Sequence, residues 1–320
     1  MASAGGPPPA EMDVAFARPG PEGEFYRYCY LSSDGARERE LRPGEWLDDQ
    51  IVPGSARCDR FEVRATAVGD ARLRPRAASL RDEGFELRRH EEAPGPPDDL
   101  QREAFQAWLQ QDMLPKAAAL VRKAVEGSYG PVAAVHVIDY TLRTTDGAGI
   151  DPRNVVREAH ADFTPESGAK RLQNESVAFK LGEDRPIRPE DGPLLVNLWQ
   201  PLVRTVRRAP LAVCDCRSLS SKDLVRKTMF FKGRRGEVFN VKQNDAQRWW
   251  YYKHMTMSEA LIFITWSPDG RTTAHTAVED PSESGDAPAR RSMEIRCAVR
   301  LAVQAVPTQE AGQGHHPSGC

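Results

Sequence analysis

Apolar residues in the first half of the chain recur with the period of a helix. Between residues 98 and 126 they are spaced three and four positions apart, which places them on one helix face: Phe105, Trp108, Leu109 and Met113. Asp98 or Asp99 is positioned to cap the start of this segment, and Pro115 is expected to kink or divide it. The pattern therefore predicts a helical segment whose aromatic residues belong to the core.

After this helix the pattern changes to short apolar runs, rich in branched and aromatic residues, which are separated by turn signals. The expected strands cover residues 132–142, 155–163, 194–199, 211–216, 249–252, 261–266, 274–278 and 292–303. Many short strands at fairly regular spacing, with little helix among them, favour a sandwich or barrel. We therefore expect a mainly β protein with flanking helices, built as a jelly roll. The region before residue 95 could add strands that extend the sheets.

The two ends of the chain differ in composition from the rest. Residues 1–22 are rich in Gly, Pro and Ala, and residues 307–320 are rich in Gly, His and Gln, so both segments are expected to be disordered. No internal repeat is visible between them, and 320 residues are compatible with one large domain. A single domain is thus expected over residues 23–306, with the helical segment at 98–126 and the jelly-roll core at 131–303.

Charge and cysteine content narrow the possible functions. The chain has 28% charged residues and a formal net charge of -2, which gives no general attraction to nucleic acids or anionic membranes. The basic run over residues 222–235 could attract an anionic substrate but is expected to be a solvated loop. None of the six cysteines has CxxC spacing, no apolar run approaches the roughly 20 residues of a membrane span, and no signal-peptide pattern is visible. We therefore expect a cytoplasmic protein that binds neither nucleic acid nor a membrane.

His160 and Asp162 are the first candidate metal ligands. Side chains of an extended segment alternate between its two faces, so these two residues point to the same side. A lone His-x-Asp pair is also compatible with a polar rim at the end of a strand. His275 could supply a third ligand, because a jelly roll brings strands that are distant in the sequence side by side. Two histidines and one carboxylate form a facial triad, which leaves positions on Fe(II) open for O₂ and a chelating cosubstrate.

Arg290 and Ser292 are candidates for binding such a cosubstrate. The distal carboxylate of 2-oxoglutarate requires a buried arginine, whose planar fork pairs with both oxygens, and often a hydroxyl group beside it. Arg290 and Ser292 lie two positions apart at the start of the last expected strand and so share a face. Arg296 on the same face is the reserve candidate. The alternative is that this face, which also carries Glu294, is the solvated side of an edge strand.

Asn197 and Trp199 share the face of another strand. Asn197 could orient the carboxylate that binds iron, and it is therefore a further candidate for the cofactor site. Trp199, together with Trp250 and Tyr252, could form an apolar wall of the site, but packing in the core is the favoured explanation for each of these aromatic residues.

Several stretches of the chain resemble the AsaB-like hydroxylase/desaturase family, which includes proteins related to CmcJ, a component of cephamycin 7α-methoxylation. These stretches cover residues 84–90, 159–165, 196–202, 210–215, 250–252 with Glu259, 275–277 and 290–296. Their most specific combination is His-x-Asp-x-Thr, Asn-x-Trp-x-Pro and His-Thr-Ala. The chain departs from the family at Gln200, where a basic residue is expected, and at Lys253 and His254. His254 is the weaker alternative as an iron ligand, because Lys253 beside it adds a positive charge.

The resemblance implies a double-stranded β-helix, which is the cupin-like jelly roll, and an Fe(II)/2-oxoglutarate-dependent dioxygenase. It implies that His160, Asp162 and His275 bind iron. It also implies that Arg290 and Ser292 bind 2-oxoglutarate. The expected function is hydroxylation, desaturation or cyclisation of a small natural-product or amino-acid-like substrate with O₂, releasing succinate and CO₂. The alternatives are a non-redox jelly-roll metal-binding protein and a metal-dependent hydrolase or isomerase, neither of which needs the Arg290–Ser292 pair.

Overall fold

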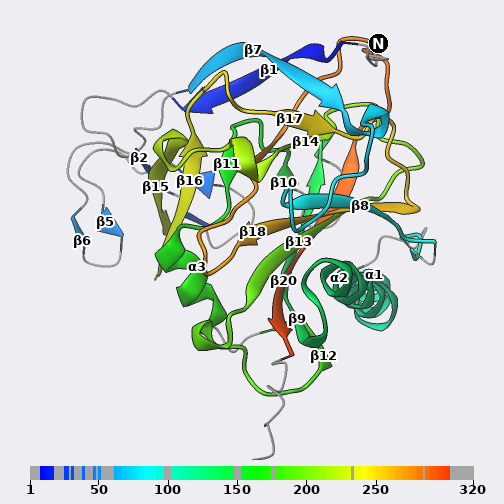
Figure 1. Ribbon diagram of the computed structural model, residues 1–320, viewed down its shortest axis with the longest axis vertical. Coiled ribbons are helices and arrows are strands. Elements are labelled where there is room, and N and C mark those ends of the chain that lie inside the picture. Colours follow the sequence, from blue (N-terminus) through cyan, green and yellow to red (C-terminus); the bar gives the residue numbers. More distant parts are fainter. Residues whose placement is uncertain are drawn as a thin grey trace, which may run out of the picture.

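The structure is a computed structural model in which two β-sheets face each other and helices lie against the outer side of one of them (Figure 1). It describes residues 8–17, 25–28, 30–31, 38–39, 46–47, 50–51, 61–91, 93–96, 102–147, 153–173, 177–231, 234–283 and 285–302. This arrangement confirms the jelly roll with flanking helices that the sequence predicts. No helix in the described part of the chain is long and apolar enough to cross a membrane.

The larger sheet has nine strands in the order β1-β7-β17-β14-β19-β11-β16-β15-β2. Its strands are β1 (Ala10–Ala17), β2 (Phe25–Tyr28), β7 (Phe61–Asp70), β11 (His160–Ala161), β14 (Leu211–Cys214), β15 (Leu224–Phe231), β16 (Arg234–Val241), β17 (Trp249–Tyr251) and β19 (His275–Ala277). β11 pairs with β19 on one side and with β16 on the other. Strands that are far apart in the sequence therefore lie side by side, as a metal site that combines His160 with His275 requires.

The smaller sheet has the order β10-β9-β20-β13-β18-β8, and β12 pairs with β9 as its seventh strand. Its strands are β8 (Phe85–Arg89), β9 (Val132–Thr144), β10 (Arg153–Asn154), β12 (Phe179–Gly182), β13 (Leu194–Pro201), β18 (Glu259–Trp266) and β20 (Arg291–Leu301). Two short hairpins lie outside both sheets: β3 (Tyr30–Leu31) with β4 (Glu38–Arg39), and β5 (Trp46–Leu47) with β6 (Gln50–Ile51). β20 lies between β9 and β13, so the last strand is central and not an edge strand.

Helices α1 (Arg102–Trp108) and α2 (Leu114–Tyr129) cover the outer face of the smaller sheet (Figure 1). A π-helical turn, Leu109–Met113, joins them just before Pro115, where the sequence predicts a kink or a break. The buried face of α2 is mostly small or branched: Leu114, Ala117, Ala118, Val121, Ala124 and Val125. These side chains pack against outward-facing apolar residues of β9, β13, β18 and β20. The predicted helix cap at Asp98 or Asp99 lies outside the described residues.

The remaining helical elements are short. Helix α3 (Pro165–Leu172) begins after Thr164, whose hydroxyl accepts a hydrogen bond from the backbone N–H of Ser167 and so caps the first turn. Four 3₁₀ turns complete the chain's regular structure in the described ranges: Ala71–Leu73, Pro189–Asp191, Cys216–Ser218 and Ser221–Asp223.

The N-terminal region contains strands that extend both sheets. β1 lies within residues 1–22, which the composition predicts to be disordered, and this part of the prediction is wrong for residues 10–17. Met12, Val14 and Phe16 alternate with other side chains and are buried, which is the pattern of a half-buried strand. The composition of the Gly- and Pro-rich flanks dominated the prediction, so the short alternation of buried residues in β1 was overlooked. The segment 307–320 lies outside the described residues.

The basic run over residues 222–235 is not a solvated loop. Most of it belongs to β15 and to the start of β16, which form an antiparallel pair. Arg226 on β15 forms ion pairs with Glu166 and Glu237, and these pairs compensate its charge within the sheet. Because carboxylates on α3 and β16 pair with Arg226, the charge run alone did not reveal the strands.

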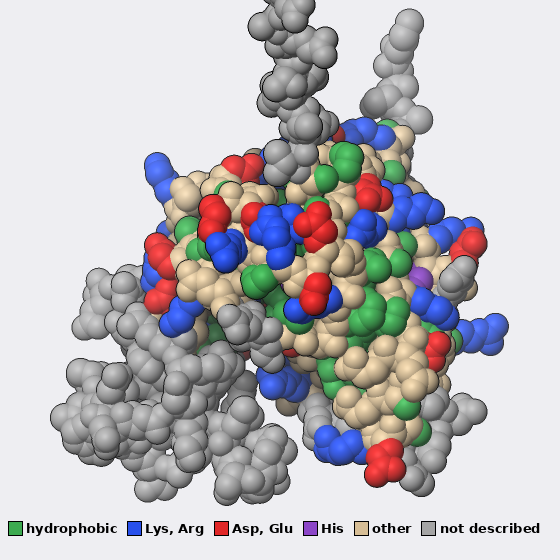
Figure 2. All heavy atoms as spheres, turned by 90° about the horizontal axis from the view of Figure 1, so that it is seen from below, with side chains coloured by type: hydrophobic (Ala, Val, Ile, Leu, Met, Phe, Trp, Pro, Cys, Tyr) green, Lys and Arg blue, Asp and Glu red, His purple; other side chains and the backbone are tan. Residues whose placement is uncertain are grey.

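Charged side chains of both signs are interspersed on the surface. On the face seen from below, Lys and Arg side chains lie next to Asp and Glu side chains, with apolar side chains between them (Figure 2). Partly exposed charges also pair directly, as in Arg185 and Asp191, where Nη2 lies 2.8 Å from Oδ1. The net charge near zero thus goes together with local pairing of opposite charges.

Candidate metal centre

The structure brings together the three residues that the sequence predicts as metal ligands. His160 on β11 lies directly opposite His275 on β19, and their ring centres are 4.3 Å apart. Asp162 follows β11, and its Oδ1 atom lies 3.7 Å from the Nε2 atom of each histidine. One possible ligand atom from each residue lies within 4.8 Å of the other two. The cluster therefore offers two nitrogens and one oxygen to a single metal ion.

Hydrogen bonds fix the tautomers of both histidines. Nδ1 of His160 lies 2.8 Å from the carbonyl oxygen of Glu158, and Nδ1 of His275 lies 3.2 Å from that of Thr273. A carbonyl oxygen only accepts, so Nδ1 carries a hydrogen in each ring, and Nε2 is the nitrogen available to a metal ion. Burial and the neighbouring His275 lower the pKa of His160 to about 4, so this ring is neutral near pH 7. A neutral ring with a fixed Nδ1–H is the form that binds a metal ion through Nε2.

Asp162 has one oxygen engaged by the protein and one facing the histidines. Its Oδ2 accepts a hydrogen bond of 2.8 Å from the amide of Asn197 and one of 3.4 Å from Nε of Arg296. Burial alone would raise the pKa of Asp162, but Arg296, the two histidines and the Asn197 amide outweigh it and hold the pKa well below its usual range. The carboxylate is therefore ionised, with Oδ1 presented to a metal ion. Asn197 lies where the sequence analysis places it, beside the carboxylate of the cluster.

The polar residues of β20 face the interior between the two sheets. Ser292 and Glu294 are 1% and 4% exposed, whereas Met293 and Ile295 between them pack outward against the helices. The alternative that this face is the solvated side of an edge strand is therefore wrong. The polar side chains on this face of β20 line the space between the two sheets, which is therefore polar.

Arg290 is a buried cation that has no acidic partner among the described residues. Its guanidinium donates to the Ser292 hydroxyl at 3.1 Å and to the carbonyl of Ala209, and it stacks on Trp199, with 5.1 Å from Cζ to the ring centre. No carboxylate of the described residues lies within 4.0 Å of it. Burial, together with the nearby Arg143, lowers the pKa of Arg290 to about 9. A guanidinium that is 2% exposed and unpaired is suited to an anionic ligand.

Arg296, the reserve candidate for the cosubstrate, is engaged by the protein itself. Its Nε contacts Asp162, its Nη1 donates to Asp139 at 3.1 Å and to a threonine hydroxyl, and its Nη2 donates to Glu294 at 2.7 Å. All three nitrogens thus have partners. Arg296 thus holds carboxylates around the metal cluster in place. Arg290 is therefore the better candidate for binding an anionic ligand.

Two residues of the site were missed as candidates. Glu294 accepts hydrogen bonds from Asn197 at 2.8 Å and from Arg296 at 2.7 Å, and Arg143 on β9 lies 3.5 Å from its other oxygen. The run of polar residues at every second position of β20 was the available signal for Glu294. Arg143 has no such signal, because only the pairing of β9 with β20 places it opposite Ser292.

The residues at which the sequence departs from the family lie away from the metal cluster. Gln200 points to the other side of β13, where its Oε1 lies 2.9 Å from Nδ1 of His90. His254, the alternative metal ligand, is half-exposed, and its Nε2 lies 2.5 Å from a carboxylate oxygen of Glu283. Lys253 contacts Asp280 at 3.2 Å in the same region. None of these residues belongs to the cluster of possible ligands found among the described residues.

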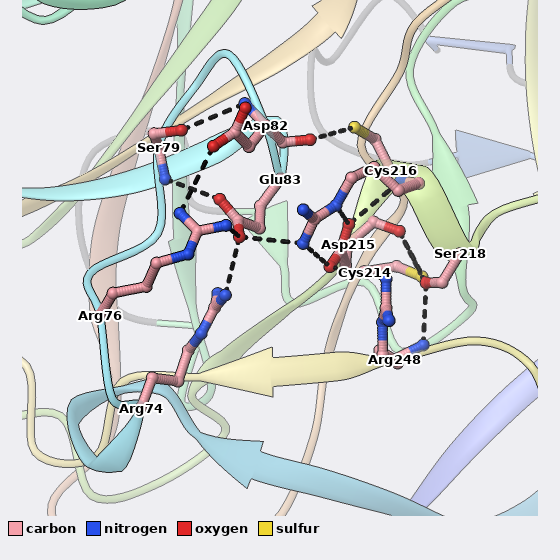
Figure 3. A network of polar contacts seen from close by, with 11 residues as sticks. Arg74, Arg76, Ser79, Asp82, Glu83, Cys214, Asp215, Cys216, Ser218 and Arg248 are labelled. Carbon is pink, nitrogen blue, oxygen red and sulfur yellow. Dashed lines mark hydrogen bonds and ion pairs between the residues drawn. The ribbon is translucent and has the colours of Figure 1, made fainter.

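A network of ion pairs holds the loop before β8 against the end of β14 (Figure 3). The carboxylate of Glu83 is sealed from solvent and lies 2.8 Å from Arg74, 2.8 Å from Arg76 and 2.9 Å from Arg217. Arg217 also contacts Asp215 at 2.7 Å. Burial alone would raise the pKa of Glu83, but a backbone hydrogen bond and the arginines hold it below its ordinary value.

This network adjoins the residues that precede His275. Gly84, next to Glu83, accepts a hydrogen bond of 3.0 Å from the hydroxyl of Thr273. The carbonyl oxygen of Thr273 in turn accepts the hydrogen bond from Nδ1 of His275. Gly84 has φ +84, and a Cβ there would lie 2.6 Å from the Thr273 hydroxyl, so only glycine fits. The loop is thereby connected to the orientation of a candidate metal ligand.

Comparison with known proteins relates the chain to a family. The model of the family described as YDMC, oxidoreductase/YMDC permease-like domain, matches residues 39–300. The hydroxylase/desaturase efuI of Hormonema carpetanum is 33% identical over 157 residues, with 44% of this chain and 50% of that protein covered. The alpha-ketoglutarate-dependent dioxygenase phiK of a fungal species is 25% identical over 253 residues, with 75% and 84% covered. The chain spans about half the length of several curated relatives that it matches.

The fold has a counterpart among solved structures. The iron and alpha-ketoglutarate-dependent endoperoxidase NvfI superimposes with a TM-score of 0.68, covering 91% of this chain and 97% of that chain. The sequences are 21% identical over this match, so the likeness shows the fold.

Proposed function

The chain belongs to the oxidoreductase/YMDC permease-like domain family, and from this membership and the buried site we propose that it is a non-haem Fe(II)/2-oxoglutarate-dependent oxygenase. Its resemblance to the AsaB-like hydroxylase/desaturases is confirmed by relatives of that name. The proposed reaction hydroxylates, desaturates or cyclises a small natural-product-like molecule and releases succinate and CO₂. A cytoplasmic location stays a prediction.

One observation carries the proposal: a cluster of two histidines and one carboxylate shares an interior with an arginine that has no acidic partner among the described residues. Two neutral imidazoles and one carboxylate are a donor set that suits Fe(II) and leaves positions open. The unpaired guanidinium suits the distal carboxylate of 2-oxoglutarate. A non-redox metal-binding protein, or a metal-dependent hydrolase or isomerase, would need the metal cluster but not the unpaired arginine.

The protein's own residues would hold both groups in place. His160, Asp162 and His275 would bind the iron through Nε2, Oδ1 and Nε2, while Asn197 and Arg296 keep the second oxygen of Asp162 engaged. Bound iron would supply the activation of O₂ and the oxidation chemistry.

Arg290 would bind the distal carboxylate of the cosubstrate. Its Nε already donates to the Ser292 hydroxyl, which leaves the hydroxyl proton free to be donated to a ligand oxygen. Trp199 beneath the guanidinium keeps water from that side. Exclusion of water strengthens the charge-assisted hydrogen bonds to the carboxylate.

Adding Fe(II) and 2-oxoglutarate to the protein without oxygen tests this function. We expect a weak visible charge-transfer band that requires both additions and that the matched variant His275→Ala does not produce. Protein that binds Fe(II) but gives no band at saturating 2-oxoglutarate would overturn the oxygenase assignment and favour a metal-binding protein of another class.

A further inference from the structure

The site has a sealed side and an open side. The side chains of His275 and Glu294 keep 3% and 5% of their area exposed. Four side chains keep between 11% and 17% of their area exposed: His160, Asp162, Arg143 and Arg296. A molecule that enters from solvent therefore meets these four side chains first.

Arg143 and Arg296 are the two arginines on the open side, and Arg143 is the one that has a nitrogen without a hydrogen-bond partner among the described residues. Its Nη1 donates to the carbonyl of Asn154 at 3.0 Å, and its Nε lies 3.5 Å from Oε2 of Glu294. Its Nη2 has no hydrogen-bond partner among the residues that the structure describes. Arg296, in contrast, uses all three nitrogens on protein partners.

The charges in the interior do not cancel. Three guanidinium groups share it with two carboxylates: Arg143, Arg290 and Arg296 with Asp162 and Glu294. The outer charges of Asp139 and Arg171 pair with each other at 2.6 Å. Histidines that bind a metal ion through Nε2 carry no charge, so one positive charge is left over. A divalent metal ion with dianionic 2-oxoglutarate leaves this excess unchanged.

The excess charge lies at Arg143 once the cosubstrate is bound. Glu294 is closer to Arg296, at 2.7 Å, than to Arg143, at 3.5 Å. Arg290 would be neutralised by the distal carboxylate of 2-oxoglutarate. Arg143 thus remains as a partly open, incompletely paired cation beside the metal cluster.

We propose that Arg143 binds a carboxylate group of the primary substrate, so that the substrate is a small carboxylic acid. This inference rests on the proposed function, because it places the substrate beside the metal-binding residues. Arg143 lies opposite Ser292 in the pairing of β9 with β20, on the inner face that also carries the cosubstrate anchor. A guanidinium pairs with a carboxylate through two parallel hydrogen bonds, and partial burial strengthens them. The other possible source of this carboxylate is 2-oxoglutarate itself.

Binding of matched acid and ester pairs tests the proposal. The probes are phenylbutyric acid and a cyclic terpenoid carboxylic acid, each compared with its methyl ester, and binding to the anaerobic Fe(II) protein with 2-oxoglutarate is followed by ligand-observed NMR. The wild type should prefer at least one acid over its ester by roughly tenfold, as expected for one charge-assisted pair. Arg143→Met should remove this preference, Arg143→Lys should keep part of it, and the exposed control Arg291→Met should leave it unchanged.

The affinity for 2-oxoglutarate, measured by calorimetry in the same variants, separates the two sources of the carboxylate. It should change less than about twofold in Arg143→Met, because Arg290 is the anchor. A loss of about tenfold there, with the acid preference intact, assigns the carboxylate at Arg143 to the cosubstrate and overturns the proposal. No acid preference in the wild type also overturns it. Absence of the charge-transfer band in every variant would instead refute the oxygenase function, because acid preference is read without that band.

Discussion

Replacing Arg290 by Lys should weaken the binding of 2-oxoglutarate while leaving metal binding intact. Arg290 uses Nε on the Ser292 hydroxyl and Nη1 on the carbonyl of Ala209, so its remaining donors are positioned for a ligand. A lysine keeps the charge, but one ammonium group cannot serve both protein partners and also pair with both oxygens of a carboxylate. Truncating a buried charge pair costs about 2–5 kcal/mol, which corresponds to about 30-fold to several-thousand-fold in affinity.

Two neighbouring substitutions calibrate this effect. Ser292→Ala removes one neutral hydrogen-bond partner and should cost about 1 kcal/mol, or less than roughly tenfold in affinity. Arg291→Ala should be nearly silent, because the Arg291 side chain is 45% exposed and its ion pair with Asp146, at 3.4 Å, is accessible to solvent.

The assay is a titration of 2-oxoglutarate into the anaerobic Fe(II) protein, followed by the visible charge-transfer band, with Fe(II) binding measured separately. Arg296→Ala completes the series. Because Arg296 contacts Asp162, its removal should weaken metal binding. Wild-type affinity for 2-oxoglutarate in Arg290→Lys, combined with a selective loss of that affinity in Arg296→Ala, would refute the assignment of the anchor.

Three further predictions concern the metal cluster and its support. Alanine at any one of the three candidate ligands should abolish Fe(II) binding with the fold kept, as checked by metal analysis and circular dichroism; retained Fe(II) binding would exclude that residue. Gly84→Ala should lower the free energy of unfolding in urea by about 1–2 kcal/mol or more, because its φ of +84 is strained for alanine. Glu83 has a lowered pKa in the folded protein, so the unfolded chain takes up its proton first and stability is lost as pH falls below 4.5. Urea unfolding between pH 7 and pH 3 should show a smaller loss for Glu83→Gln than for the wild type, and equal losses would contradict this account.

Local alternation in the sequence was sufficient to pair His160 with Asp162 and Arg290 with Ser292, although it missed Glu294 and Arg143 as site residues. His160 and Asp162, like Arg290 and Ser292, are separated by two positions, and in an extended chain this spacing places both side chains on one face whatever the fold. The pairing of β11 with β19 is a property of the topology, and it became predictable only once a jelly roll was assumed. Short apolar runs between turn signals predicted seven strands within two residues of their bounds, but the strand expected at 155–163 is wrong in length, because only His160–Ala161 pairs as β11.

Contacts between strands that are distant in the sequence could not be predicted from the sequence. The alternating polar residues of β20 are compatible with a solvated edge and with a polar interior, and only the position of β20 between β9 and β13 decides between them. Arg143 shows the same limit, because its partner Glu294 lies on another strand. The strands β15 and β16 were missed because the carboxylates that pair with Arg226, on α3 and on β16, lie 60 and 11 positions away in the sequence.

We expect that the charge of Arg290, which is buried in the interior between the two sheets, does not serve stability. Burying a cation without an acidic partner costs several kcal/mol, and a buried charge is often replaced by apolar residues without loss of stability. Arg290→Met keeps most of the side-chain volume above Trp199 and loses the hydrogen bonds to the Ala209 carbonyl and the Ser292 hydroxyl, which costs about 1–3 kcal/mol. These effects are opposite in sign and similar in size, so the metal-free variant should be at least as stable as the wild type in urea, within about 1 kcal/mol. The same variant should bind no 2-oxoglutarate. A loss of 3 kcal/mol or more would mean that Arg290 is retained for the fold, and the argument that its unpaired charge is kept for a ligand would fail.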